Sequence, residues 1–236
     1  MVLIYSRVGA EIRNGYENRI NESREVLGIL NQRINYEKNR DSKHTDKLTS
    51  FQKQKMILRI DSLTQYILLY ERTEKLLHQF HTIAPDLFQE IDTIKNAYNE
   101  KTDVYVKFLP DEKMIESQLG RTIMGQCFED ENICFSEYGV RSVLIIIYSE
   151  INPLLVLAHE LGHVRYQVPH LATYFDYFKE TYYGRSYEPY FIGHYPTDLS
   201  GITAQEYERR FAQYFNIYTK KLKHTTRELT KGSNRS

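Results

Sequence analysis

The chain has 236 residues, enough for one substantial domain or for a compact domain with a helical extension. Lys plus Arg and Asp plus Glu both total 31, so the formal net charge is zero and the basic footprint of a nucleic-acid-binding protein is missing. Hydrophobic residues make up 41% and charged residues 26%, the balance of a soluble globular protein. The longest apolar runs are too short to span a bilayer. We therefore expect no nucleic-acid partner and no membrane span, while the compartment stays open between the cytoplasm and export with a signal removed.

The first hundred residues predict a long helical hairpin. Apolar residues recur at coiled-coil-like intervals from about residue 16 to 38 and again from 47 to 82, with a polar connection at 39–46. The two apolar stripes are Ile20, Leu27, Leu30 and Ile34, and then Met56, Ile60, Leu63, Ile67, Tyr70 and Leu77. After Pro85 we expect a third helix from Asp86 to about Lys101. Residues 1–102 would then form an arm, either packed as a scaffold or presenting a surface to a protein partner or to a second copy of the chain.

The pattern changes from helix to strand at Asp103. Residues 104–109 and 142–150 are rich in β-branched and aromatic side chains and predict two strands. Between them, Gly125 to Ser136 is expected to form a short hairpin around an acidic turn. Cys127 and Cys134 would face each other across that hairpin, as a disulfide or as two free thiols. The result is a small sheet that leads directly into the next helix.

The stretch from Asn152 to Tyr166 carries the most informative residues, His159-Glu160-Leu161-Gly162-His163. Asn at a cap followed by Pro at the first helical position predicts a helix, which places the two imidazoles one turn apart on one face. There they can hold one metal ion. The rest of this helix is apolar, so we expect it to be buried and its polar side chains to need partners. The alternative is a core helix whose histidines are satisfied by hydrogen bonds.

These five residues resemble the HExxH signature of zincin metallopeptidases, a resemblance that rests mainly on residues 142–170. It implies an α+β fold, mostly helical, in which the small sheet packs on the metal-binding helix. It also implies hydrolysis of peptide bonds in a peptide or protein substrate. One Zn²⁺ ion would be held by His159, His163 and a third protein ligand, with Glu160 as the general base that activates a zinc-bound water. Residues 103–224 would form this catalytic domain and residues 225–236 a polar tail.

Two further helices are predicted after the motif. Pro169 is expected to stop the motif helix, and His170 to about Tyr183 predicts the next one. Residues 184–201 are loop-like, and His194 and Tyr195 within them are candidate donors to an oxyanion. From Ser200 the chain is expected to be helical again to about residue 223, followed by a frayed polar end.

A comparison of zincin subfamilies narrows the candidates for the third zinc ligand. The metzincin pattern HExxHxxGxxH does not match, because Tyr166 replaces its Gly and Pro169 its third His. In gluzincins the third ligand is a Glu on a downstream helix, and the chain offers Glu206 and Glu208. Glu208 falls on the apolar face of the predicted helix whereas Glu206 points away from it, so Glu208 is the expected ligand and Glu206 the second choice.

Other interpretations of these residues stay open. Glu208 would otherwise pair with Arg209 or Arg210, and Asp198 is a weaker third candidate for the ligand. The whole chain would otherwise be a catalytically inactive zinc-binding regulator of zincin type, or a helical interaction protein in which the motif is accidental. The intact Glu160 favours an enzyme, because a site that only binds zinc has no need of a base there.

Overall fold

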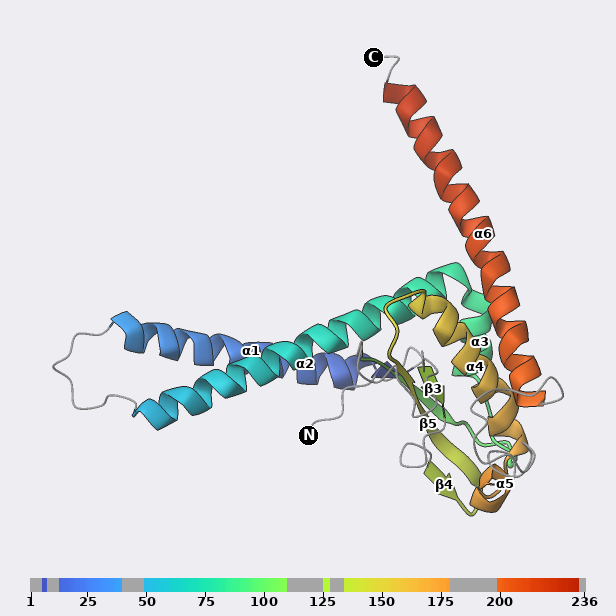
Figure 1. Ribbon diagram of the computed structural model, residues 1–236, viewed down its shortest axis with the longest axis horizontal. Helices are drawn as coiled ribbons and strands as arrows, with labels where there is room; N and C mark the ends of the chain where they lie inside the picture. Colours follow the sequence, from blue (N-terminus) through green and yellow to red (C-terminus); the bar gives the residue numbers. More distant parts are fainter. Residues whose placement is uncertain are drawn as a thin grey trace, which may run out of the picture.

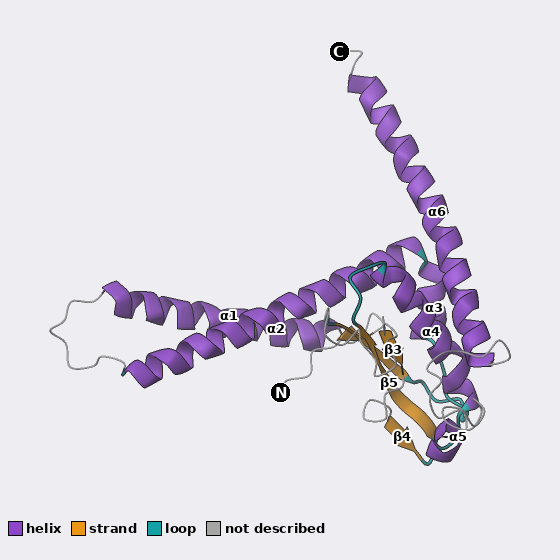
Figure 2. Cartoon of the chain, in the orientation of Figure 1, coloured by secondary structure: helices purple, strands orange, loops and turns teal. Residues whose placement is uncertain are grey.

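The computed structural model of the chain describes residues 6–7, 13–39, 49–109, 125–127, 134–178 and 199–233. The helices are α1 (Arg13–Asn39), α2 (Ser50–Ile83), α3 (Pro85–Asp92), α4 (Pro153–His170), α5 (Tyr174–Phe178) and α6 (Leu199–Ser233). The strands are β1 (Ser6–Arg7), β2 (Asp103–Phe108), β3 (Gly125–Cys127), β4 (Cys134–Ser136) and β5 (Gly139–Ile147). Helices predominate and the strands join in one small sheet, so the expected mostly helical α+β class is confirmed (Figures 1 and 2).

The predicted helical hairpin is present as an arm made of α1 and the first half of α2, which lie alongside each other and project from the rest of the molecule (Figure 1). One series of the less exposed side chains along the arm follows alternating spacings of three and four residues, the heptad pattern of a coiled coil. They are Ile20, Ser23, Leu27, Leu30 and Ile34 on α1, and Lys53, Met56, Ile60, Leu63, Ile67 and Tyr70 on α2. At the start of α2, Thr49 and Gln52 form a reciprocal capping box.

The second half of α2 belongs to the body of the molecule. Side chains between Leu76 and Ile94 share one hydrophobic core with β2, β5, α4 and α6. Phe80 of α2, for example, stacks on Phe211 of α6 with ring centroids 4.9 Å apart. The main core therefore extends across residue 102, the boundary expected between arm and catalytic domain, and the arm proper ends near Tyr70.

Helix α3 is shorter than predicted: it ends at Asp92 instead of about Lys101. The next residues form a turn around Asn96, whose side-chain oxygen accepts hydrogen bonds from the backbone N–H groups of Tyr98 and Glu100. Its amide nitrogen donates to the Tyr138 carbonyl. Asn99 has a φ of 66°, which a helix cannot contain. Asparagine side chains that bond locally to the backbone compete with helix, and here that competition ends α3.

The sheet has the order β1-β2-β5-β3, with β4 also paired to β5. β2 and β5 are parallel, and the other pairs are antiparallel. The predicted hairpin of β3 with β4 is wrong, because both strands pair with the same edge of β5. Cys127 lies opposite Ile145 and Cys134 opposite Ser142, so their Cα atoms are separated by about 10 Å, three strand residues. A disulfide spans no more than about 7 Å between Cα atoms.

The helices after the motif also differ from prediction. Helix α4 continues through Pro169 and ends at His170, because a proline in the last turn removes a single hydrogen bond and Leu171 still donates to the Gln167 carbonyl. The helix expected from His170 begins only at Tyr174, and residues 179–198, including residues 184–198 of the expected loop, lie outside the described part of the chain. Helix α6 continues ten residues beyond 223, to Ser233, so most of the predicted polar tail is helical. Among the helices described, none combines the length and apolar character needed to cross a membrane.

Candidate metal centre

Helix α4 places His159 and His163 side by side. The helix begins with Pro153 after Asn152, whose φ of 52° turns the chain sharply from the sheet into the helix. Leu157, Ala158 and Leu161 are fully buried, which fixes the face that α4 turns to the core. The two imidazole rings then meet edge to face, with their Nε2 atoms 3.1 Å apart.

Helix α6 crosses α4 at Gly162, in the middle of the motif. A Cβ atom added at Gly162 would lie 2.4 Å from the Ala204 Cα and 2.8 Å from the Thr203 carbonyl oxygen, both backbone atoms. Only glycine therefore allows this approach. On α6, Ser200, Ala204 and Glu208 are spaced four residues apart and so form one stripe that faces α4. The sequence does signal this crossing, because a glycine inside a helix costs about 1 kcal/mol and calls for a packing reason.

Both histidines are held through their Nδ1 atoms by that stripe of α6. His163 Nδ1 lies 2.8 Å from Ser200 Oγ, and His159 Nδ1 lies 3.1 Å from Glu208 Oε1. A carboxylate only accepts hydrogen bonds, so His159 Nδ1 carries a proton in this contact, and in the neutral imidazole Nε2 then directs its lone pair toward His163. Oxygen partners on one ring nitrogen are what orient histidines that bind a metal through the other.

The geometry of the pair fits one zinc ion. Two Zn–N bonds of 2.0–2.1 Å at a tetrahedral angle separate their nitrogens by about 3.3 Å, and the observed separation is 3.1 Å. The same contacts also form without a metal if one proton lies between the two Nε2 atoms. In that case the Ser200 hydroxyl donates to His163 Nδ1. This is the hydrogen-bonded alternative to a metal site.

The expected third ligand, Glu208, does reach the histidines, but it contacts Nδ1 of His159 and not the side where the two Nε2 atoms meet. Among the described residues, no group of three or more His, Cys, Asp or Glu side chains is arranged to hold a metal. Glu206 is exposed on the opposite face of α6, as its helical position predicts. Arg210 pairs with Glu90 of α3. Asp198, His194 and Tyr195 lie outside the described residues.

Glu160 is buried beside the histidines and against the edge of the sheet. Burial, with a smaller contribution from the negative charge of Glu208, raises the pKa of its carboxyl to about 8. A divalent cation nearby would act in the opposite direction and favour the carboxylate. A Cβ added at Gly125 would lie 3.0 Å from Glu160 Oε1 and 2.7 Å from Val156 Cγ1. The backbone of β3 therefore runs directly along this carboxyl group.

No protein-family model matches the chain, and searches of curated proteins and of solved structures give no match either. The functional argument therefore depends on the chain's own residues. These are two imidazoles from α4, two oxygen partners from α6, and a buried carboxyl group between α4 and β3.

Proposed function

We propose that this protein is a zinc-dependent metallopeptidase of the zincin type, gluzincin-like, acting on a peptide or protein substrate. One observation carries the proposal. The imidazoles of His159 and His163 meet at their Nε2 atoms, each oriented through Nδ1, beside the buried carboxyl group of Glu160. A purely structural pair of buried histidines needs hydrogen-bond partners but has no need of a third ionisable side chain at the same place.

His159 and His163 would hold the ion through Nε2, and we propose Glu208 as the carboxylate of the site. As a third ligand, Glu208 would bind the ion itself; as a partner of His159 Nδ1–H, it would fix the ring. Glu208→Gln separates these roles. The amide keeps an acceptor for Nδ1–H, so a fixing role predicts zinc affinity within about tenfold of the wild type, whereas a ligand role predicts a far larger loss.

A bound zinc ion supplies a Lewis acid that polarises a carbonyl and makes water more acidic. The chain's own residues would perform the proton transfers. Glu160 would accept a proton from the attacking water and pass it to the leaving amine. Its apolar surroundings raise its pKa, and the charge of a bound ion would lower it, so the two effects oppose each other.

The position of β3 supports a peptide as substrate. Within the described sheet, β3 is an edge strand, and its Gly125 lies against Glu160. An extended peptide that adds to such an edge forms backbone hydrogen bonds regardless of its sequence. A peptide aligned in this way would run past the general base, which suits cleavage of a peptide bond better than of a compact small molecule.

The test compares the wild type with Glu160→Gln on a mixed peptide library, with zinc content measured for both. The wild type should cleave, and the variant should bind one zinc ion per chain and not cleave, because an amide cannot accept the proton. Full activity in Glu160→Gln would refute the assigned mechanism.

A second candidate function is a zinc-binding regulator of zincin type that acts through its arm. The observation in its favour is a set of outward apolar side chains on the distal half of the arm. They are Ile29, Tyr36, Phe51, Ile57 and Leu58, each about half exposed or more. Stoichiometric zinc without cleavage of any peptide in the library would support this function over catalysis.

A further inference from the structure

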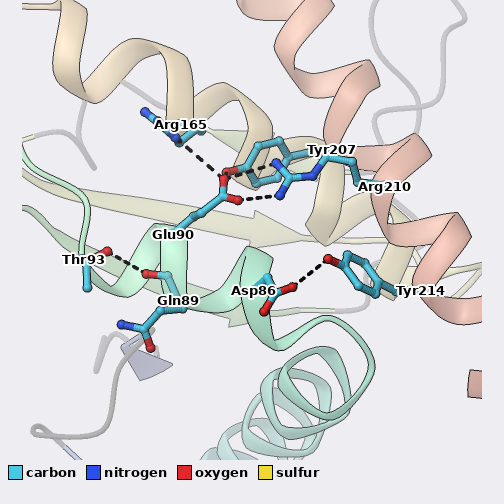
Figure 3. Close-up of polar contacts among 8 residues, drawn as sticks. All are labelled: Asp86, Gln89, Glu90, Thr93, Arg165, Tyr207, Arg210 and Tyr214. Atoms are coloured by element: carbon cyan, nitrogen blue, oxygen red, sulfur yellow. Dashed lines mark hydrogen bonds and ion pairs between the residues drawn. The ribbon is translucent and has the colours of Figure 1, made fainter.

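Glu90 of α3 joins the two helices that build the candidate metal centre (Figure 3). Its carboxylate accepts hydrogen bonds from the Tyr207 hydroxyl at 2.5 Å and from both terminal nitrogens of Arg210, at 2.5 and 3.2 Å. Arg165 Nε of α4 lies 3.9 Å away. Partial burial raises the pKa of Glu90, but hydrogen bonds from Arg210 and Tyr207 and the charges of the two arginines outweigh it, so the pKa lies below its ordinary value.

The partners of Glu90 are close in sequence to the residues of the site. Tyr207 and Arg210 flank Glu208 on α6, and Arg165 follows His163 by two residues on α4. The stripe of α6 that contains Ala204 and Glu208 meets α4, while the side chains of Tyr207, Arg210 and Tyr214 meet α3. Helix α6 is thus held from two sides, and its rotation about its own axis determines where Glu208 lies.

A small rotation of α6 is enough to break the contact of Glu208 with His159. Side-chain tips lie 5–6 Å from a helix axis, so each 10° of rotation moves them by about 1 Å. The contact from Glu208 Oε1 to His159 Nδ1 is 3.1 Å, and a further 1 Å exceeds hydrogen-bonding distance. Glu90 opposes such a rotation through a two-pronged charged contact with Arg210, the most directional kind of side-chain pairing.

We propose that Glu90 is a positioning residue of the metal centre: it fixes the rotation of α6 and thereby keeps the Glu208 carboxylate on His159 Nδ1. The consequence for metal binding rests on the proposed function, but the effect on the His159 ring does not. Glu90 touches neither histidine, so its influence passes through Tyr207 and Arg210 on α6.

The chain offers a matched control in Asp86. This residue lies one turn before Glu90 on α3 and accepts a hydrogen bond at 2.8 Å from the hydroxyl of Tyr214, which lies one turn beyond Arg210 on α6 (Figure 3). Asp86→Asn therefore weakens the contact between the same two helices, α3 and α6, but at a point farther from the histidines. Glu90→Gln and Asp86→Asn make the same chemical change, loss of a carboxylate charge with its size retained.

Two readouts test the proposal. In the metal-free protein, ¹⁵N NMR of the His159 ring reports which nitrogen carries the proton. We expect Nδ1–H in the wild type and in Asp86→Asn, and a mixture of both tautomers in Glu90→Gln. With Co²⁺ as the probe, the visible spectrum and the dissociation constant report the metal centre. We expect Glu90→Gln to alter the spectrum and weaken binding about tenfold, and Asp86→Asn to stay within twofold of the wild type.

Equal behaviour of Glu90→Gln and Asp86→Asn in both readouts would overturn the proposal. Tyr207→Phe removes one hydrogen bond to Glu90 and little volume, so it should change the His159 tautomers and Co²⁺ binding in the same direction as Glu90→Gln but by less. This variant replaces Glu90→Gln in the test if Glu90→Gln does not fold. If the wild type binds no Co²⁺ but the His159 tautomers differ between the wild type and Glu90→Gln as expected, the metal centre is refuted and the positioning role is supported. If Glu90→Gln binds Co²⁺ as tightly as the wild type and its His159 ring is unchanged, the metal centre is supported and the positioning role of Glu90 is refuted.

Discussion

The close crossing of α4 and α6 at Gly162 predicts a specific effect of Gly162→Ala. The added Cβ would lie 2.4 Å from the Ala204 Cα, whereas carbon atoms in contact need about 3.5 Å. The obstacle is backbone, so the two helices must separate by about 1 Å. The 2.8 Å contact of His163 Nδ1 with Ser200 Oγ and the 3.1 Å contact of His159 Nδ1 with Glu208 Oε1 would then both exceed 3.5 Å.

The magnitude follows from two opposing effects. Overpacking of this kind costs about 1–3 kcal/mol, and replacing glycine by alanine within a helix returns about 1 kcal/mol. We therefore expect Gly162→Ala to lower the free energy of unfolding by about 1 kcal/mol. Gly28→Ala in α1 is the matched control, because its added Cβ meets no atom within 4 Å. That variant should be up to about 1 kcal/mol more stable than the wild type.

The assay is urea unfolding of the wild type and both variants, followed by zinc titration of each. Gly162→Ala should move the urea midpoint down and Gly28→Ala should move it up. Because both histidines lose their oxygen partners, Gly162→Ala should also weaken zinc binding by at least about tenfold. A Gly162→Ala protein that is stabilised as much as Gly28→Ala, or that binds zinc like the wild type, would refute the reasoning from the helix crossing.

Two further predictions concern stability. Thr73→Val should cost about 1–3 kcal/mol in urea unfolding, because the buried Thr73 hydroxyl accepts the Phe108 N–H at 3.0 Å and valine leaves that donor unsatisfied. Thr82→Val, at an exposed threonine that bonds to its own helix in the same way, should stay within about 0.5 kcal/mol of the wild type. Because the folded pKa of Glu90 is lowered, its contribution to stability is present above the ordinary value of 4.5 and is lost as the pH falls through the folded value. The difference in urea midpoint between the wild type and Glu90→Gln should therefore shrink from pH 7 to pH 3, and a constant difference would contradict the assignment.

Local repeats in the sequence were enough to predict much of the fold. The stripes from Ile20 to Ile34 and from Met56 to Tyr70 predicted the coiled-coil arm, because seven-residue spacing is a property of neighbouring residues alone. The same holds for Glu208, since a helical angle measured against nearby apolar residues indicated that it points inward.

Features set by distant residues could not be predicted in this way. Helix α3 ends early because the Asn96 side chain bonds to the N–H groups of Tyr98 and Glu100, and the carbonyl of Tyr138, 42 residues away, holds that side chain in place. The pairing of β3 and β4 with β5 instead of with each other depends on which edge of β5 is open, and local pattern contains no information on that. The contact of Glu90 with Arg210 could not be predicted from the sequence for the same reason, because the two residues lie 120 positions apart and no repeat connects them.

The most direct test of the account is a measurement of zinc bound per chain and of its ligands by X-ray absorption, on the wild type and on His163→Ala. We predict one zinc ion per wild-type chain, with two imidazole nitrogens at about 2.0–2.1 Å in its coordination shell, and loss of that ion in His163→Ala. A wild-type chain that takes up no zinc, or that holds it equally well without His163, would contradict the claim that His159 and His163 share one metal ion.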